Sequence, residues 1–181
     1  YLQRYKGKTW SVSALYKALD RLHTRYKQKA EEIAYQHTRK RLNSISVVFY
    51  DVTTLYFEAE DEDDLRKLGF SKDGKFQHPQ IMLGLLVGEM GLPIGYDLFE
   101  GNTFEGHTLL PTLKRIQDSY GFDPPVVIAD AAMLSKSNLT QLVSAHYQYI
   151  IGARIKSESE SIKKQILEKT VGMKSDDRLV L

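Results

Sequence analysis

Two aspartates in this sequence could share one chemical task. Asp51 follows the apolar run 46–50, and Asp130 follows a second apolar run at 125–129. Both runs are short and rich in β-branched residues, which is typical of buried strands. A carboxylate at the end of such a strand must face solvent, a cation or a partner, because an unpaired buried charge is very costly. The repeated pattern predicts a site of two carboxylates that is assembled from distant parts of the chain.

Two carboxylates held close together repel each other unless a cation or a shared proton relieves them. Mg²⁺ is the natural counter-ion, since it takes oxygen ligands from one or two carboxylates and from substrate phosphates. Two such ions, roughly 3.5–4 Å apart, can activate the attacking oxygen and stabilise the leaving oxygen in phosphodiester chemistry. That mechanism usually needs a further acidic ligand. Glu158 and Glu160 lie in a polar Ser/Glu run that is typical of solvated surface, so neither is a strong candidate.

The segments around the aspartates follow a specific order. A first strand at 46–51 is followed by a hairpin, and the remaining strands alternate with helices. The expected elements are strands at 80–87, 92–99, 125–130 and 147–151, and helices at 107–120, 135–145 and 158–169. This order predicts an α/β fold with a mixed five-strand sheet, three antiparallel strands and then two parallel ones, with helices on both faces. The strand at 125–130 can then lie parallel to the strand at 46–51, which brings Asp51 and Asp130 to one crevice. Pro93 indicates that its strand lies at a sheet edge.

Charge is distributed unevenly along the chain. Residues 1–43 carry eleven Lys/Arg against three acids, whereas the remainder carries fourteen against twenty. Residues 11–42 have helical character, with apolar residues at helical spacing from Val12 to Leu22. Such a basic helix could contact a polyanion such as DNA, or it could simply be solvated. The sequence contains no cysteine and no apolar run long enough to span a bilayer.

Other charged residues have weaker patterns. The acids at 58–64 precede a short helical turn expected at 65–68, where they favour a solvated helix start over a metal site. Four surface cations could contact phosphates, two on a turn and two after the last strand: Lys72, Lys75, Arg154 and Lys156.

Five motifs occur in a characteristic order: Phe49–Glu58, Gly69–Gly74, Leu83–Val87, Gly101–Thr103 and Ala129–Ser135. Together they resemble the catalytic region of bacterial insertion-sequence transposases of the cut-and-paste DDE type. In that family a ribonuclease-H-like core is interrupted by a β-rich insertion. The resemblance extends from about Trp10 to the end of the chain, although residues 131–132 are both alanine where the family often has a glycine.

The resemblance implies that Asp51 and Asp130 match the first two acids of the catalytic triad and hold two Mg²⁺ (or Mn²⁺) ions in the complete site. The third acid, a glutamate on a helix after the insertion, is expected beyond this chain, so the chain is expected to be an inactive fragment. The implied division is a basic helical segment at 1–43, an incomplete catalytic core at 44–172 and the start of the insertion at 173–181. The implied partners are double-stranded DNA, as element ends and target, and a second protomer of the full-length protein. The implied setting is the bacterial cytoplasm, at the nucleoid, with no membrane contact.

Two alternatives stay open at this point. A haloacid-dehalogenase-like phosphatase also has an apolar strand that ends in a nucleophilic aspartate, as in Asp51-Val-Thr53. That family generally needs a second acid where Thr53 stands. The other alternative is a non-catalytic DNA-binding module that keeps the same fold with idle aspartates.

Overall fold

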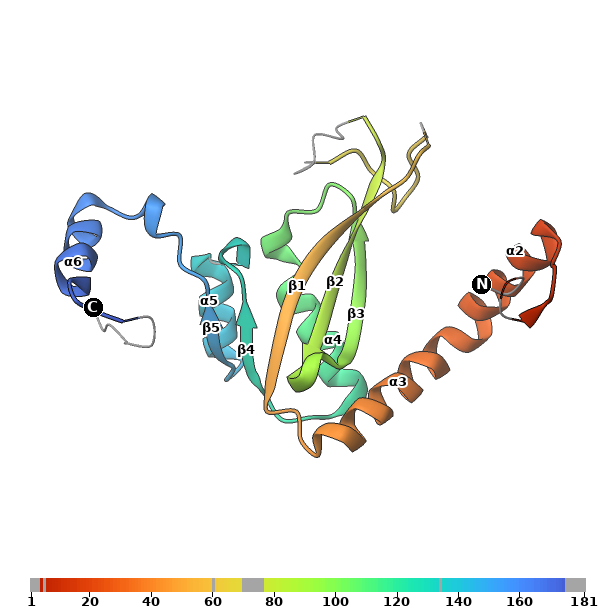
Figure 1. Ribbon diagram of the computed structural model, residues 1–181, viewed down its shortest axis with the longest axis horizontal. Coiled ribbons are helices and arrows are strands. Elements are labelled where there is room, and N and C mark those ends of the chain that lie inside the picture. Colours follow the sequence, from red (N-terminus) through yellow and green to blue (C-terminus); the bar gives the residue numbers. More distant parts are fainter. Residues whose placement is uncertain (1–3, 5, 60, 70–76, 134, 175–181) are drawn as a thin grey trace.

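A mixed sheet of five strands, in the order β3-β2-β1-β4-β5, organises the fold. The computed structural model describes residues 4, 6–59, 61–69, 77–133 and 135–174 (Figure 1). The strands are β1 (Val47–Tyr56), β2 (Gln80–Gly88), β3 (Pro93–Glu100), β4 (Val126–Ala129) and β5 (Gln148–Ile151). β1, β2 and β3 pair antiparallel, whereas β4 pairs parallel with both β1 and β5. The expected ribonuclease-H-like order is confirmed, and Pro93 begins the edge strand β3.

Helices precede the sheet and connect its last strands. They are α2 (Val12–Arg21), α3 (Lys27–Leu42), α4 (Leu109–Tyr120), α5 (Lys136–Ser144) and α6 (Glu160–Thr170). A π-helical turn at Leu22–Tyr26 joins α2 to α3, so the helix expected at 11–42 is confirmed as a nearly continuous segment. Three helices have a serine N-cap. The hydroxyls of Ser11, Ser135 and Ser159 accept hydrogen bonds from backbone N–H groups of α2, α5 and α6. In the described part of the chain, no helix is long and apolar enough to cross a membrane.

The hydrophobic core lies on one face of the sheet, which we call the inner face. Leu113 of α4 and Leu142 of α5 pack in a single cluster with Val48, Leu86 and Val127 of the strands. The sequence predicted helices on both faces, and the structure packs α4 and α5 together on the inner face. The steps from β3 to β4 and from β4 to β5 run in the same direction across the sheet, so right-handed connections place α4 and α5 on the same side. Figure 1 looks onto the opposite, outer face.

The two N-terminal helices differ in how far they are buried. α2 has the stronger apolar stripe but contains no buried residue, whereas the polar α3 buries Tyr35 and Thr38. Tyr35 stacks on Tyr120 of α4 with ring centroids 3.9 Å apart, and the Thr38 hydroxyl donates to the Pro93 carbonyl at 2.7 Å. α3 therefore lies against the β3 edge, while α2 projects away from the sheet (Figure 1).

Two local expectations need correction. β1 does not end near Asp51 but continues to Tyr56, because Val52–Tyr56 stay paired with β2. The turn at 65–68 is not helical; Lys67 instead forms an antiparallel bridge with Gln80. Most of the segment 173–181 lies outside the described residues, as do Lys72 and Lys75.

Candidate active site

Asp51 and Asp130 lie next to each other across the β1–β4 pair. The last paired residues of these parallel strands are Tyr50 and Ala129, so each aspartate is the next residue after a matched pair. Neighbouring strands run about 4.8 Å apart, which sets the scale of the separation between the two backbones. Both side chains are exposed. The register thus places the two residues side by side where the β1–β4 pairing ends, which is the neighbourhood that the sequence predicted.

Alternation along β1 explains why Asp51 faces solvent. Val48 and Tyr50 are buried on the inner face, whereas Phe49 and Asp51 are exposed on the outer face. Period-two alternation makes this separation automatic, because successive side chains of a strand point to opposite faces. The Val52 N–H donates to Asp51 Oδ1 at 2.8 Å. The carboxylate is therefore anchored by one bond and is otherwise open.

A turn rather than a strand holds Asp130. β4 ends at Ala129, and the 3₁₀ turn η4 (Ala131–Met133) follows the aspartate. The Ala132 N–H donates to Asp130 Oδ1 at 2.7 Å, and the Met133 N–H donates to the Asp130 carbonyl at 3.1 Å. Like Asp51, Asp130 has one oxygen fixed by the backbone. Among the described residues, neither carboxylate forms an ion pair with a basic side chain.

The donor set fits a hard divalent cation. Mg²⁺ and similar ions prefer oxygen ligands and commonly use only one or two carboxylates, with water and phosphate oxygens completing the shell. Asp51 and Asp130 supply such ligands, and neither is ion-paired within the described residues. The described segments contain no group of three or more His, Asp or Glu side chains able to hold a metal. Two carboxylates by themselves would leave most of the ligands of such a cation to be supplied by other groups.

Tyr50 separates the site from the core. Its ring is 3% exposed, and its hydroxyl lies 3.5 Å from the Thr112 hydroxyl of α4. Burial raises the pKa of Tyr50, and the negative charges of Asp97 and Asp51 raise it further, although hydrogen bonds to Thr108 and Thr112 act in the opposite sense. Tyr50 is thus an uncharged, buried residue that directly precedes Asp51 in β1.

The predicted phosphate contacts are only partly within the described structure. The Arg154 Nε donates to the Ala131 carbonyl at 2.9 Å, which places this arginine beside the turn that follows Asp130. Lys156 is exposed in the 3₁₀ turn η5 (Ile155–Ser157). Lys72 and Lys75 lie outside the described residues. Arg154 is therefore the cation that the structure brings to the site.

Asn138 has a role that the sequence did not predict. Ser135 is the actual cap of α5. The Asn138 side chain is 4% exposed and donates to the carbonyls of Met133 and Gly106. A usable signal was present, since asparagine is a poor residue inside a helix unless its side chain has a specific partner.

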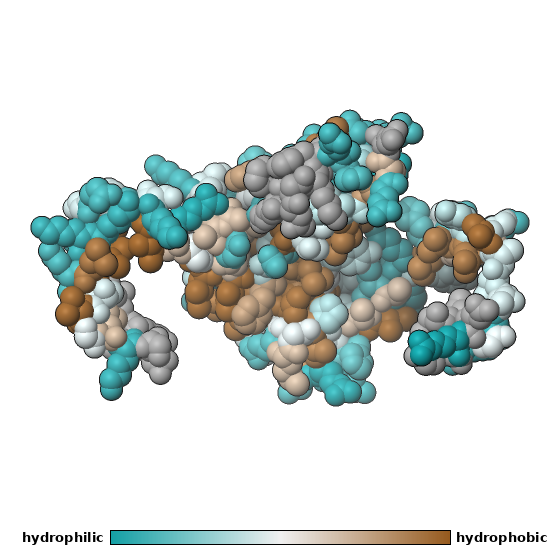
Figure 2. All heavy atoms as spheres, turned by 45° about the horizontal axis from the view of Figure 1, so that its top comes forward, coloured by the Kyte–Doolittle hydropathy of each residue, from teal (hydrophilic) through white to brown (hydrophobic). Residues whose placement is uncertain are grey.

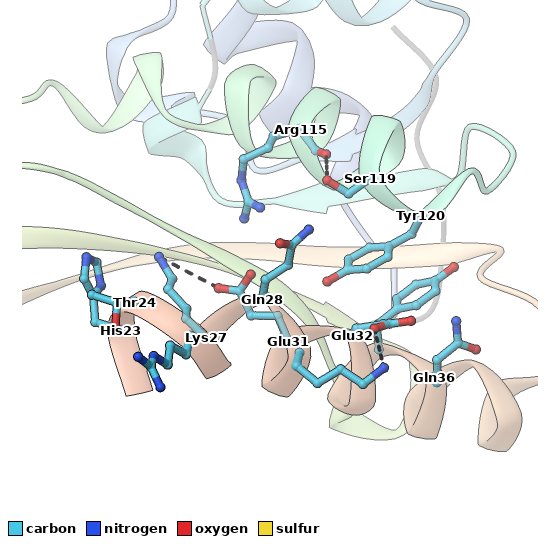
Figure 3. A pocket seen from close by; sticks show the side chains of 13 residues that line it. His23, Thr24, Lys27, Gln28, Glu31, Glu32, Gln36, Arg115, Ser119 and Tyr120 are labelled. Carbon is cyan, nitrogen blue, oxygen red and sulfur yellow. Dashed lines mark hydrogen bonds and ion pairs between the residues drawn. The ribbon is translucent and has the colours of Figure 1, made fainter. Parts of the chain in front are cut away.

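A polar groove lies elsewhere, between α3 and α4, with a volume of about 860 Å³ (Figure 3). Its walls include the stacked rings of Tyr35 and Tyr120, and its charges are largely paired with each other. Lys29 lies 2.8 Å from Glu32, and Lys27 lies 4.0 Å from Glu31. The groove contains neither Asp51 nor Asp130, so its position does not support it as the active site.

Comparison with known families settles the relationship of this chain. The model of the family described as transposase DDE domain matches residues 42–178. The chain belongs to this family. The matched range contains Asp51, Asp130 and all five strands. A search of curated protein sequences finds no match.

Solved structures give weaker likenesses. One is the Mos1 transposase paired-end complex with left transposon end, at 12% identity and a TM-score of 0.42, with 82% of this chain and 54% of that chain covered. Another is the Mos1 transposase catalytic domain and Raltegravir with Mn, at 14% identity and a TM-score of 0.39, covering 81% of this chain and 80% of that chain. The chain thus spans about half the length of the first of these proteins. Membership of the family rests on the family match and not on these likenesses.

Proposed function

We propose that Asp51 and Asp130 are the first two metal-binding carboxylates of an enzyme that cleaves DNA strands and transfers them during transposition. The observation that carries this proposal is the register, in which both aspartates follow the matched pair Tyr50–Ala129 on parallel strands. Membership of the DDE domain family gives the reaction class. Metal-assisted hydrolysis and transesterification of phosphodiesters require carboxylates placed in this way.

The residues of this chain would act by binding and orienting. Asp51 and Asp130 would hold Mg²⁺ or Mn²⁺, two ions in the complete site, and these ions would activate the attacking oxygen and stabilise the leaving oxygen. Each aspartate keeps one oxygen on a backbone N–H and offers the other outward. The described segments supply only two acids at this place, so we expect the chain alone to be inactive until a third acid joins them.

DNA contacts would come from exposed cations. Arg154 lies beside the Asp130 turn and would contact a phosphate near the reacting bond. Lys156, Lys72 and Lys75 would contact other phosphates of the DNA. The arm at 1–43 would contact DNA or a second protomer, since α3 exposes Arg39, Lys40 and Arg41. We infer that the partners are double-stranded DNA, as element ends and target, and a second copy of the full-length protein. Each phosphate contact removed should lower the salt dependence of binding by about one in log–log slope.

The domain division also remains our inference. Residues 44–172 would form the catalytic core and residues 173–181 would begin an insertion. A phosphatase of the haloacid-dehalogenase type is disfavoured by β1, which continues as a paired strand through Tyr56 and leaves Thr53 where that family needs an acid. The idle DNA-binding module is the alternative that the following experiment separates.

The test is Asp51→Asn and Asp130→Asn in the full-length protein, with Asp123→Asn as the matched control. Asp123 is an exposed aspartate that precedes β4, whereas Asp130 follows this strand. We expect each of the first two substitutions to lower Mg²⁺-dependent cleavage of element-end DNA by about a thousandfold, because several kcal/mol of transition-state stabilisation would be lost. The melting temperature and DNA affinity should stay unchanged, as should the activity of the control. Full activity in both variants would overturn the assignment of the aspartates. DNA binding by the wild type without any Mg²⁺-dependent cleavage would support the idle module instead.

A further inference from the structure

The two aspartates are supported by different kinds of structure. Asp51 lies inside the ten-residue strand β1 and pairs with Leu85 of β2. Asp130 follows the end of β4, and its Oδ1 is held by the N–H of Ala132. A short turn such as η4 has no row of strand-pairing hydrogen bonds to hold it in place. The position of the Asp130 carboxylate therefore depends on the contacts that fix η4.

Buried contacts hold this turn from the α5 side. The Asn138 Nδ2 donates to the Met133 carbonyl at 2.9 Å and to the Gly106 carbonyl at 2.7 Å. Gly106 belongs to the 3₁₀ turn η3 (Glu105–His107) that precedes α4, and a Cβ on it would lie 3.4 Å from the Ala132 carbonyl oxygen. One amide group thus ties together α5, the turn after Asp130 and the turn before α4.

The opposite side of the turn has different support. The Gly152 N–H donates to the Ala129 carbonyl at 3.1 Å, and a Cβ on Gly152 would lie 2.9 Å from the Ala131 nitrogen. The Arg154 Nε donates to the Ala131 carbonyl, but Arg154 is exposed. Asn138 is therefore the side chain that fixes the turn from within, where no solvent competes for the bonds.

Only a side chain with two donors can satisfy both carbonyls. Asparagine provides two N–H groups from one planar amide, whereas aspartate and leucine of similar size provide none. A buried carbonyl left without a donor costs about 1–3 kcal/mol, so the turn would move to find another partner. That movement would carry the Ala132 N–H, and with it the Asp130 carboxylate.

We propose that Asn138 is the positioning residue for the second metal-binding aspartate: its buried amide fixes the turn whose N–H groups orient Asp130. This inference rests on the function proposed above and deepens it. Asn138 touches neither substrate nor metal; it acts through Met133 and Ala132. Partners of this kind outside the ligands typically change metal affinity by 10-fold to 100-fold when they are removed.

The experiment compares three variants of the 181-residue chain by NMR. Asn138→Leu removes both donors and Asn138→Ser keeps one. Thr38→Val is the matched control, because Thr38 is equally buried and also donates its side chain to a backbone carbonyl, that of Pro93, on the β3 edge. Mn²⁺ is titrated while the broadening of the Val52 and Ala132 amides is followed. The solvent-exchange rates of the Ala132 and Met133 amides, which bond to Asp130, are measured without metal.

We expect Asn138→Leu to raise the Mn²⁺ concentration for half-broadening about tenfold and to accelerate exchange selectively at Ala132 and Met133. For Asn138→Ser, both the Mn²⁺ concentration and the exchange rates should lie between those of Asn138→Leu and the wild type. If Asn138→Leu does not fold, both measurements are made on Asn138→Ser alone. Thr38→Val should lower the melting temperature and change neither readout.

Two results would overturn the inference. One is a wild-type Mn²⁺ response in folded Asn138 variants. The other is an acceleration of exchange spread over the whole chain, which would indicate ordinary loss of stability. If the wild type itself shows no Mn²⁺ response, the metal site proposed for Asp51 and Asp130 fails, while exchange at Ala132 and Met133 still decides whether Asn138 fixes the turn.

Discussion

The two faces of the sheet differ in burial and in the residues they carry. On the inner face, Val48, Leu86 and Val127 are fully buried beneath α4 and α5. On the outer face, Phe49, Leu85 and Leu98 keep between 36% and 45% of their surface exposed, and Asp51 lies among them. Figure 2 shows hydrophobic residues at the surface across the middle of the molecule. The buried contacts that stabilise the fold are therefore concentrated on the inner face. Asp51 and Asp130 are exposed and take no part in this packing.

This arrangement explains how a strand can serve both purposes. Because side chains alternate, Tyr50 contributes to the core while its neighbour Asp51 stays in solvent. A carboxylate on the inner face would have to lose its charge or find a partner. The comparison predicts that neighbouring residues of one strand respond very differently to the same substitution.

The largest contrast should come from two adjacent leucines of β2. Leu86 is fully buried on the inner face and Leu85 is 36% exposed on the outer face. Leu86→Ala should lower the free energy of unfolding by about 2–5 kcal/mol, because it leaves a cavity under α4. Leu85→Ala should cost about 1 kcal/mol or less, because little packing is lost. Urea unfolding of both variants is the measurement, and equal losses would contradict the division between faces.

A smaller effect should appear at alkaline pH through Tyr50. Its pKa is raised, mainly by burial, so the folded chain keeps the phenol proton above pH 10 while the unfolded chain loses it. Ionisation then favours the unfolded state, and stability falls as the pH rises through 10. Urea midpoints between pH 9 and 11 should fall less steeply for Tyr50→Phe than for the wild type. Tyr16→Phe, on the exposed helix α2, is the control and should follow the wild type.

The smallest change in stability should come from Asp63, whose carboxylate accepts hydrogen bonds from neighbouring residues of its own loop. Its oxygens accept the Arg66 N–H at 2.6 Å, the Arg66 Nε at 2.7 Å and the Leu65 N–H at 2.9 Å. The Arg66 backbone bond, followed by its side chain and then Leu65, lowers the pKa of Asp63 from 3.8 to about 2. Asp51 and Asp130 each accept a single backbone N–H, so Asp63 is the more fully satisfied acid.

A depressed folded pKa means that the contribution of Asp63 is complete above pH 3.8 and is lost as the pH falls toward 2. The urea midpoint of the wild type should therefore exceed that of Asp63→Asn at pH 5, and the difference should close by about pH 2. A difference that is independent of pH would show that the bonds to Arg66 and Leu65 do not require the charge.

The sequence by itself determined much of this fold. The alternation in 46–56, the hairpin with Pro93 at its edge and the later strand–helix order are local properties, and they led to the correct sheet. Because a β–α–β connection is parallel and right-handed, the order of elements also brought Asp51 beside Asp130. The pairing of the candidate ligands was therefore predictable from two apolar runs and their connections.

Only the tertiary structure decided what covers each surface. Alternation shows that a strand has two faces but not which one receives the helices, and here α4 and α5 share one face. The apolar stripe of α2 is not buried, whereas the neighbouring α3 contacts β3 through Thr38 and α4 through Tyr35. The role of Asn138 was hidden for the same reason. Its two acceptors, Met133 and Gly106, are 5 and 32 residues away in the chain, and only folding brings both to one amide.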